Sequence, residues 1–178
     1  MSERTNIDVF KSILNVDSGL SRQARFICTI LPSGQFGLGD YILRELPFLC
    51  TDAEIPGESL NTADIQYYGP SFKLPYQPVY NDLVLTFIMR ANHRERKFFH
   101  NWIRYIKGNG SNDMHFRNEY DSIITIETIS EVDPNPTLMT ATFQHAYPVN
   151  VSPVPMSWAD DGFLRMQVQF SYTEHRIE

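Results

Sequence analysis

Cysteine is scarce in this chain of 178 residues, which contains only Cys28 and Cys50. Both lie within apolar, strand-like runs and not in a cluster of metal ligands, so we expect buried, reduced thiols and no disulfide. Reduced thiols are typical of a reducing compartment. The scarcity of cysteine therefore predicts a protein that is not held together by disulfides.

Long apolar runs are also missing. No segment approaches the roughly 20 consecutive apolar residues that a transmembrane helix needs. The first residues, Met1 to Asp8, lack the apolar segment of a signal peptide. We therefore expect a protein that neither spans a membrane nor is secreted through a signal peptide.

The residue patterns of catalytic, metal and nucleotide sites are absent as well. The five histidines never occur at the i, i+4 spacing of helical zinc ligands. Neither a nucleophile elbow nor a phosphate-binding loop occurs, and the pair Asp160 and Asp161 before Gly162 is typical of a hairpin turn. We therefore expect no catalytic residue, no metal and no cofactor. A hydrolase with catalytic residues dispersed along the chain would leave no such pattern and stays an alternative.

Aromatic residues, at 13%, and prolines, of which there are eleven, are what the sequence has in abundance. This composition is typical of many short strands joined by defined turns, with little helix, in a single domain. The net charge of -6 is uneven, because residues 90–107 hold six basic side chains and a single acidic one. The rest of the chain is strongly acidic and would repel nucleic acid.

The clearest strand pattern runs from Phe163 to Thr173, where apolar and polar residues alternate strictly. This period of two predicts a half-buried antiparallel strand. The polar face carries amides and hydroxyls with hardly any charge, so a partner could slide along it without binding tightly. An ordinary solvated face is the alternative. The inward residues are Leu164, Met166, Val168, Phe170 and Tyr172, and the outward residues are Arg165, Gln167, Gln169, Ser171 and Thr173.

Further strands are predicted at residues 25–31, 41–51, 82–89, 122–130 and 137–147. The strand at 82–89 is apolar on both faces, which predicts a central strand covered on both sides. In the last strand the alternation places His145 and Tyr147 on the same face as Phe143.

Two helices are predicted, at 6–16 within an N-terminal extension (1–24) and at 92–107. Asn92 and Glu95 can form a capping box for the second helix, whose apolar stripe should cover the outer face of the strand at 82–89. Its basic side chains offer a face to an acidic partner, with an ordinary solvated face as the alternative. The segment 108–121 has few apolar anchors and predicts an exposed, variable loop.

A long, irregular hairpin is predicted at residues 60–80, which Gly69, Pro70, Pro75 and Pro78 interrupt. Prolines confine such strands to sheet edges and bulges. The segment is too rich in aromatic residues to be an arm wholly exposed to water. Two arrangements would cover it: the arm folds back onto its own subunit, or it lies across another copy.

Several segments follow one another in order along most of the chain. They are Phe48 to Gly57 followed by a long hairpin, the strand 82–90, the helix with Lys97 to Trp102, the exit at Gly108 to Gly110, the corner Tyr147 to Asn150, Trp158, and the final strand with Val168 to Tyr172. Over about residues 25–175, their order and spacing resemble the tube proteins of contractile-tail bacteriophages (myoviruses).

The resemblance implies a mainly β fold: an antiparallel β-sandwich or half-barrel over residues 25–178, with one flanking helix and a long projecting hairpin, contributing to a ring-shaped β-barrel. It implies a structural virion protein of the phage tail, assembled in the host cytoplasm, whose hexameric rings stack into a hollow tube. DNA would pass through the lumen during infection without specific binding. The implied partners are copies of the same chain and the sheath, tape-measure and baseplate proteins, with no membrane insertion. A baseplate ring of the same fold that initiates the tube is one alternative, and a monomeric β-sandwich that binds a ligand is another.

Three groups of residues are then candidates for assembly. The inter-subunit interface candidates are Tyr67, Tyr68, Phe72 and Tyr76. The lumen-facing candidates are Gln167, Gln169 and Ser171, and the sheath-facing candidates are Arg94, Arg96, Lys97 and Arg104.

Overall fold

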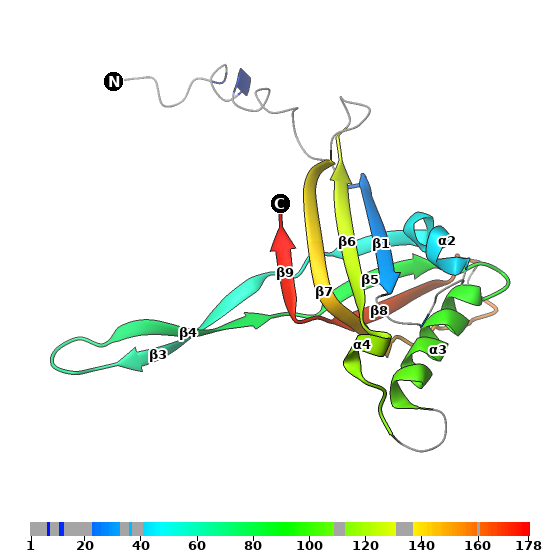
Figure 1. The fold of residues 1–178 in the computed structure, drawn as a ribbon. Helices are drawn as coiled ribbons and strands as arrows, with labels where there is room; N and C mark the ends of the chain where they lie inside the picture. The colour runs from blue at the N-terminus through cyan, green and yellow to red at the C-terminus, as the bar shows by residue number, and fades with distance from the viewer. Residues whose placement is uncertain are drawn as a thin grey trace.

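The computed structural model describes residues 7, 11–12, 23–32, 36, 41–108, 113–130, 137–159 and 161–178. Only residues 7, 11 and 12 of the predicted helix at 6–16 are among them, and most of the predicted extension at 1–24 lies outside the described residues. Antiparallel strands dominate the described part, which confirms the predicted fold class (Figure 1). In chain order the elements are β1 (Phe26–Pro32), α2 (Ile42–Leu49), β2 (Cys50–Glu54), β3 (Glu58–Ile65), β4 (Phe72–Tyr80), β5 (Leu83–Ile88), α3 (Arg94–Lys107), α4 (Arg117–Tyr120), β6 (Ser122–Ile129), β7 (Thr137–Val151), β8 (Arg165–Ser171) and β9 (Glu174–Ile177).

The main sheet bends so that its two halves enclose the core. Its strands follow the order β1, β6, β7, β8, β5, β2, each pair is antiparallel, and β9 also pairs with β7. We call β1, β6 and the first part of β7 the first half-sheet, and the last part of β7 with β8, β5 and β2 the second half-sheet. Within the described residues β1 and β2 do not pair, so the sheet is a half-barrel and is not closed.

A β-bulge at His145 lies where β7 passes from one half-sheet to the other. From Ala146 to Phe143, β7 takes three residue steps opposite two steps of β6, and His145 has a positive φ of 55°. The predicted common face of Phe143, His145 and Tyr147 was therefore wrong. The bulge inverts the alternation, so that Ala146 is buried and His145 is exposed.

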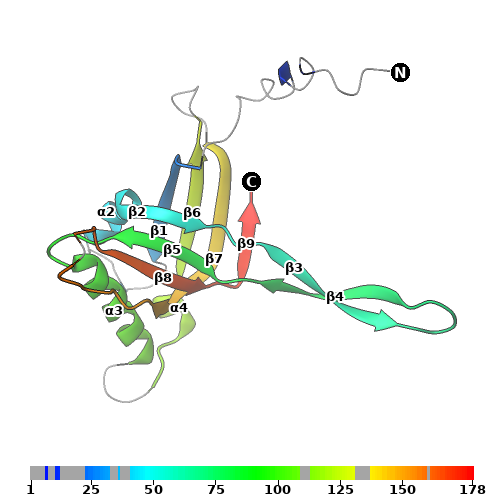
Figure 2. The ribbon, with the colours of Figure 1, turned by 180° about the vertical axis from the view of Figure 1, so that it is seen from behind.

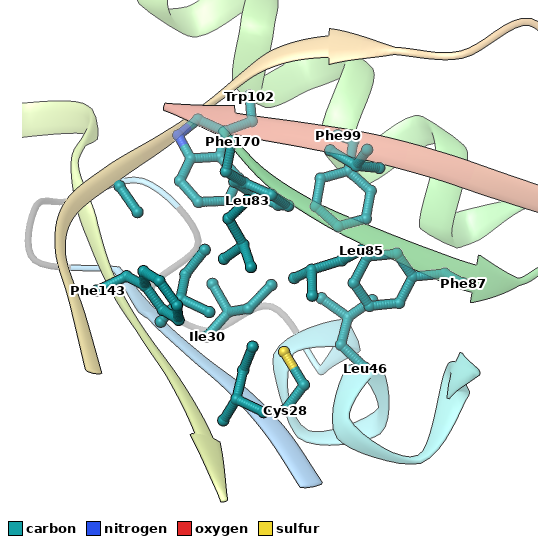
Figure 3. Packing of buried hydrophobic residues seen from close by; sticks show 14 of the residues in the cluster. Cys28, Ile30, Leu46, Leu83, Leu85, Phe87, Phe99, Trp102, Phe143 and Phe170 are labelled. Carbon is teal, nitrogen blue, oxygen red and sulfur yellow. The ribbon is translucent and has the colours of Figure 1, made fainter. Parts of the chain in front are cut away.

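Apolar side chains from both half-sheets and from α2 and α3 fill the core (Figure 3). The ring of Phe99 on α3 lies 5.2 Å from that of Phe87, and Trp102 lies 6.2 Å from Phe170, between ring centroids. The buried hydrophobic residues of the core are Cys28, Ile30, Ile42, Leu46, Leu83, Leu85, Phe87, Phe98, Phe99, Trp102, Ile124, Ile126, Ala141, Phe143, Ala146, Met166, Val168 and Phe170. The alternation predicted for the strand at 163–173 is thus confirmed at its central positions.

The segment predicted as a strand at 41–51 is mostly a helix, α2, and only its end belongs to β2. A short apolar run fits either period, and Pro47 argued against a helix because proline disfavours helix interiors. Ile42 and Leu46, one turn apart, are nevertheless both buried, and α2 packs against β1. Burial of this pair favours the helix over the extended form that proline would suggest.

Helix α3 covers the core side of the second half-sheet and not its outer face. Phe99 packs on Phe87, which points inward from β5. The opposite face of β5, with Val84, Thr86 and Ile88, is half-exposed. The prediction that both faces of this strand are covered was therefore wrong, and the second half-sheet has a face open to solvent.

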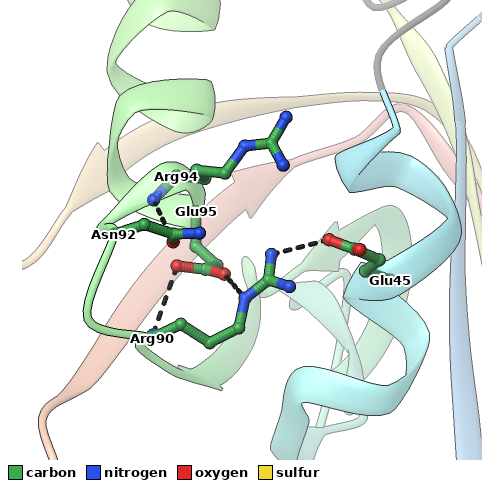
Figure 4. Close-up of polar contacts among 5 residues, drawn as sticks. All are labelled: Glu45, Arg90, Asn92, Arg94 and Glu95. Carbon is green, nitrogen blue, oxygen red and sulfur yellow. Dashed lines mark hydrogen bonds and ion pairs between the residues drawn. The ribbon is translucent and has the colours of Figure 1, made fainter.

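The start of α3 lacks the predicted capping box. Asn92 Oδ1 accepts a hydrogen bond from the N–H of Arg94 at 3.2 Å, but the Glu95 carboxylate accepts its hydrogen bonds from Arg90 (Figure 4). His93, just before the helix, is left-handed with φ 50°. The helix begins within two residues of the predicted position without this cap.

The Glu95 carboxylate is fully buried and binds Arg90 instead (Figure 4). Its Oε1 lies 2.5 Å from Arg90 Nε, and Arg90 Nη2 lies 2.6 Å from Glu45 Oε2. The hydrogen bond from Arg90 lowers the pKa of the Glu45 carboxyl, and the two carboxylates together raise the pKa of Arg90. This network ties α2, the end of β5 and α3 together.

Two further predictions are settled by local structure. Both thiols are free, as expected, although only Cys28 is buried and Cys50 is half-buried. The hydrogen bond with Cys50, and burial, raise the pKa of the Cys28 thiol, which therefore stays protonated.

The predicted loop at 108–121 contains a short helix, α4, and Tyr120 O accepts a hydrogen bond from Trp102 Nε1 at 2.8 Å. Residues 109–112 lie outside the described part.

Candidate assembly surfaces

Strands β3 and β4 form a two-stranded arm that projects from the body (Figures 1 and 2). The predicted interface residues lie along it and are uncovered: Tyr67 is 87% exposed, Tyr68 94%, Tyr76 64% and Phe72 56%. The arm therefore does not fold back onto its own subunit, which removes the first of the two predicted arrangements. Exposed aromatic patches of this kind are typical of interaction sites.

The base of the arm is fixed by His175 of β9, a residue that the sequence did not single out. The His175 side chain is 3% exposed, and its Nε2 lies 3.2 Å from Glu58 Oε1 at the start of β3. Its ring lies between Tyr80, Phe143 and Tyr172, with centroids 5.4 to 5.8 Å away. This contact joins the base of the arm to the C-terminal strand.

Tyr172 makes the arm base sensitive to alkaline pH. Burial first, and then the carboxylates of Asp82 and Glu58, raise its pKa to about 12. An unfolded tyrosine ionises near pH 10. The folded state therefore favours the neutral phenol, and this contribution to stability is present below pH 10 and lost as pH rises through about 12.

We expect the Tyr172→Phe variant to lose this dependence. The free energy of unfolding, from denaturant titrations at intervals between pH 8 and 12, should fall more steeply above pH 10 in the unsubstituted protein than in the variant. Tyr76→Phe is the matched control, because this exposed tyrosine lies on the arm. Parallel curves for Tyr172→Phe and the unsubstituted protein would contradict the assignment.

The open face of the second half-sheet carries the predicted lumen candidates. Gln167 is exposed, whereas Gln169 and Ser171 are half-buried. Gln169 Nε2 donates a hydrogen bond to Asp82 Oδ2 at 2.8 Å, and Gln167 pairs with Thr86 of β5. The three residues therefore share one polar face, as the alternation of β8 predicts.

Acidic residues that sequence reasoning missed extend this face. Asp52 pairs with Thr86 and Glu54 with Val84, which places both carboxylates in line with the outer residues of β5. Both are exposed. The strand predicted at 41–51 ended before Asp52, so no strand alternation was predicted for these two residues. The face carries Asp52, Glu54 and Asp82 against Arg165, and is predominantly acidic.

The predicted sheath-facing residues lie on the exposed side of α3. Arg94, Arg96, Lys97 and Arg104 are all exposed, while Phe98, Phe99 and Trp102 on the other side of the helix are buried. Because α3 packs on the core side of the second half-sheet, its basic face points away from the open acidic face of that sheet.

The second half-sheet ends in two free edges. Among the described strands, β2 pairs only with β5, and the last part of β7 pairs only with β8. The antiparallel series β7, β8, β5, β2 makes β2 run antiparallel to β7. Free edges with unpaired backbone groups are ready to pair with another chain.

A second apolar surface lies in the loop between β7 and β8. Met156 is 70% exposed, Phe163 85%, and Trp158 is fully exposed. A groove of about 450 Å³ opens here, lined by Val154, Pro155, Met156, Ser157, Gly162, Phe163, Leu164 and Arg165. The proline-rich sequence of this corner has no periodicity, so no pattern predicted the groove.

The described residues contain no cluster of three or more histidine, cysteine or acidic side chains that could hold a metal. Within that part of the chain, every helix is too short or too polar to cross a membrane.

Comparison with known proteins agrees with this architecture. A family model described as "Phage tail tube protein" matches residues 21–178. No curated protein matches the chain. A chain from the extracellular contractile injection system PVC, solved as the sheath–tube complex in the extended state, has TM-score 0.66 and 15% identity over 98% of both chains.

Two chains of the anti-feeding prophage also share the fold. One, from the tube-terminating cap, has TM-score 0.65 and 16% identity, covering 89% of this chain and 91% of its own. The other, from the baseplate, has TM-score 0.64 and 14% identity, covering 89% of this chain and 95% of its own. At such identities these matches establish a common fold.

Proposed function

This chain belongs to the phage tail tube protein family, and from that premise we propose that it forms hexameric rings that stack into the hollow tube of a contractile tail. The family consists of structural tube proteins, which confirms the expectation that the chain is not an enzyme. The hydrolase and the monomeric ligand-binding module are set aside for the same reason.

The observation that carries the proposal is the pair of free edges on the second half-sheet. A neighbouring copy turned about a ring axis brings its β2 beside the last part of β7, and the two strands meet antiparallel. Every copy then pairs its β2 edge with one neighbour and its β7 edge with the other neighbour. This is the head-to-tail contact that closes a ring. A continuous barrel removes edges that would be a liability in a monomer.

The channel wall in this arrangement is the open face of the second half-sheet. Gln167, Gln169 and Ser171 contribute amides and hydroxyls, and Asp52 and Glu54 contribute carboxylates. Carboxylates repel phosphates, and uncharged amides give few fixed contacts, so DNA can slide through without specific binding.

The outer surface of the ring carries the basic face of α3, because this helix lies on the side of the half-sheet opposite the channel. We extend the proposal to a sheath that docks on Arg94, Arg96, Lys97 and Arg104. Chains of the same fold come from a sheath–tube complex and from a baseplate, which supports sheath and baseplate partners. The tape-measure protein would occupy the lumen, and the tube would be assembled in the host cytoplasm as part of the virion.

Light scattering after size-exclusion chromatography, followed by negative-stain microscopy of the same fractions, tests the proposal. We expect six-subunit rings and stacked tubes. A protein that stays monomeric at high concentration contradicts it. The images also separate two roles: a tube-body subunit forms long tubes by itself, whereas a baseplate initiator stops at a single ring.

A further inference from the structure

The groove of the β7–β8 loop and the exposed end of α2 lie at the same end of the second half-sheet, opposite the arm (Figures 1 and 2). At this end Cys50, where β2 starts, pairs with Phe87, and Phe87 pairs with Met166 near the start of β8. Phe48 precedes Cys50 by two residues, and the lining of the groove ends at Arg165, directly before Met166. The two surfaces are therefore level with each other, one at the β2 edge of the half-sheet and the other beside its β7 edge.

Phe48 is an exposed aromatic side chain on a fixed backbone. It is 85% exposed, whereas Leu46 just before it is fully buried. The carbonyl of Leu46 accepts a hydrogen bond from the N–H of Cys50 at the end of α2, and Cys50 begins the pairing with β5. Because the backbone is held on both sides of Phe48, its burial by another molecule costs little conformational entropy.

Backbone hydrogen bonds also fix the groove on both sides. The N–H of Ser152 donates to the carbonyl of Gln167, and the N–H of Met89 donates to the carbonyl of Leu164, both at 2.9 Å. A cavity of about 150 Å³ already accepts a benzene ring, and the groove has about 450 Å³. The groove is thus preformed and large enough for one phenyl side chain.

The side chains that line the groove suit an aromatic ring. Met156 and Phe163 are 70% and 85% exposed, and Leu164 adds half-buried apolar surface. Thioether sulfur atoms and phenyl groups make favourable contacts with an aromatic ring, and a guanidinium such as that of Arg165 stacks on its face. Burial of Phe48 against this lining would remove apolar surface from water on both partners.

The charges of the two surfaces are complementary. Arg165 is the charged side chain among the described residues that line the groove, and the exposed Asp161 lies outside the lining. Asp52 and Glu54, which follow Phe48 on β2, are exposed carboxylates. A basic groove therefore meets an acidic strand, and opposite charges favour one orientation of the contact over others.

We propose that Phe48 of one copy fills the β7–β8 groove of the copy beside it in the same ring. The inference rests on the proposed function, in which β2 of one copy pairs antiparallel with the last part of β7 of its neighbour. In that pairing the residues before Cys50 meet the residues after Val151, and rotation about the ring axis keeps both surfaces at the same end of the ring. Backbone hydrogen bonds alone specify register weakly, so the seated side chain fixes the register in which the two edges pair.

A photoreactive side chain tests which residues Phe48 contacts. The full-length variant Phe48→p-benzoylphenylalanine keeps an aromatic group at this position. Rings assembled from equal amounts of isotope-labelled and unlabelled variant are irradiated, and the cross-linked peptides are identified by mass spectrometry. We expect links between different chains, from residue 48 to the segment 154–165. Rings whose links map to other segments, or only within one chain, overturn the inference while the tube function stands.

A double-mutant cycle tests whether the two surfaces act on each other. Phe48→Ser and Phe163→Ser each remove an exposed ring, so both variants should fold with an unchanged circular dichroism spectrum. We expect each to raise the concentration at which half of the chains are in rings about thirtyfold, as is typical for an interface anchor. The double variant should raise it no further, because both substitutions remove the same contact. Tyr41→Ser, which removes a 69% exposed aromatic residue at the other end of α2, is the matched control and should leave it unchanged.

Light scattering over a dilution series measures these concentrations. A double variant whose effect is the product of the two single effects contradicts a direct contact. A Phe163→Ser variant that forms rings at the unchanged concentration would assign the groove to a contact outside the ring, and this also overturns the inference. Failure of the unsubstituted protein to form rings would instead overturn the proposed function.

Discussion

Tubes assembled from a Gln167→Lys, Gln169→Lys variant will retain DNA that tubes of the unsubstituted protein release. The two positions lie on the open face of β8, beside the carboxylates of β2 and Asp82. Six copies per ring would add a band of ammonium groups to a wall that is otherwise amide and carboxylate. Each phosphate that a lysine neutralises releases counterions, so retention becomes strong and dependent on salt.

The measurement is the amount of nuclease-protected linear DNA that sediments with tubes assembled in its presence. We expect retention at low salt that falls about a thousandfold between 50 and 200 mM salt, as is typical for several phosphate contacts. Asn101→Lys with Asn118→Lys adds the same charge at exposed positions on α3 and α4. DNA bound by that control should stay accessible to nuclease. Equal protection in both variants, or none in the lumen variant, would remove Gln167 and Gln169 from the channel wall.

Elements whose apolar residues follow one regular period were predictable from the sequence. The alternation around β8 predicted which side chains are buried, because one face of that strand meets the core and the other meets solvent. The stripe of Phe98, Phe99 and Trp102 predicted α3 for the same reason. The interface candidates on the arm followed from an excess of tyrosine that no single strand pair could bury.

Features that depend on tertiary packing were not predictable. The bulge at His145 inverts the period in the middle of β7, and nothing in the local sequence marks the inversion. Helix α2 forms despite Pro47 because Ile42 and Leu46 find partners that are distant in sequence. The side of the sheet that α3 covers determines which face is open. Asp52 and Glu54, which lay outside the predicted strands, therefore belong to the proposed channel wall.

The free edges of the second half-sheet also depend on tertiary structure, because strand order determines them. A sequence can show that strands exist, but only their order shows which strands are left without a partner. Here the order leaves β2 and the last part of β7 at the two ends of a four-strand series. An even series places antiparallel strands at its two edges, so identical subunits can pair edge to edge in a closed ring. The open face and the edges belong to the same half-sheet, so the proposed channel wall and the proposed ring closure depend on the same four strands.

The Glu95→Ala variant is expected to destabilise the subunit by about 3 kcal/mol, because two hydrogen bonds to a charged, fully buried carboxylate are lost. Glu95 is fully buried and accepts hydrogen bonds from both the side chain and the backbone N–H of Arg90. Its loss also frees the end of β5 from the start of α3, the two segments between which the network is built. For a domain of this size we expect the melting temperature to fall by roughly 10 °C.

Thermal unfolding followed by circular dichroism measures this effect, at a protein concentration low enough that assembly does not contribute. Glu45→Gln is the matched control, since Glu45 binds the same arginine but its side chain is 43% exposed and water can replace it. It should leave the melting temperature almost unchanged at neutral pH. Equal losses for the two substitutions would mean that Arg90 acts as a surface charge. A loss confined to Glu95→Ala would identify the buried carboxylate as the group that fixes α3 on the sheet, and with it the direction of the basic face that we assign to the sheath.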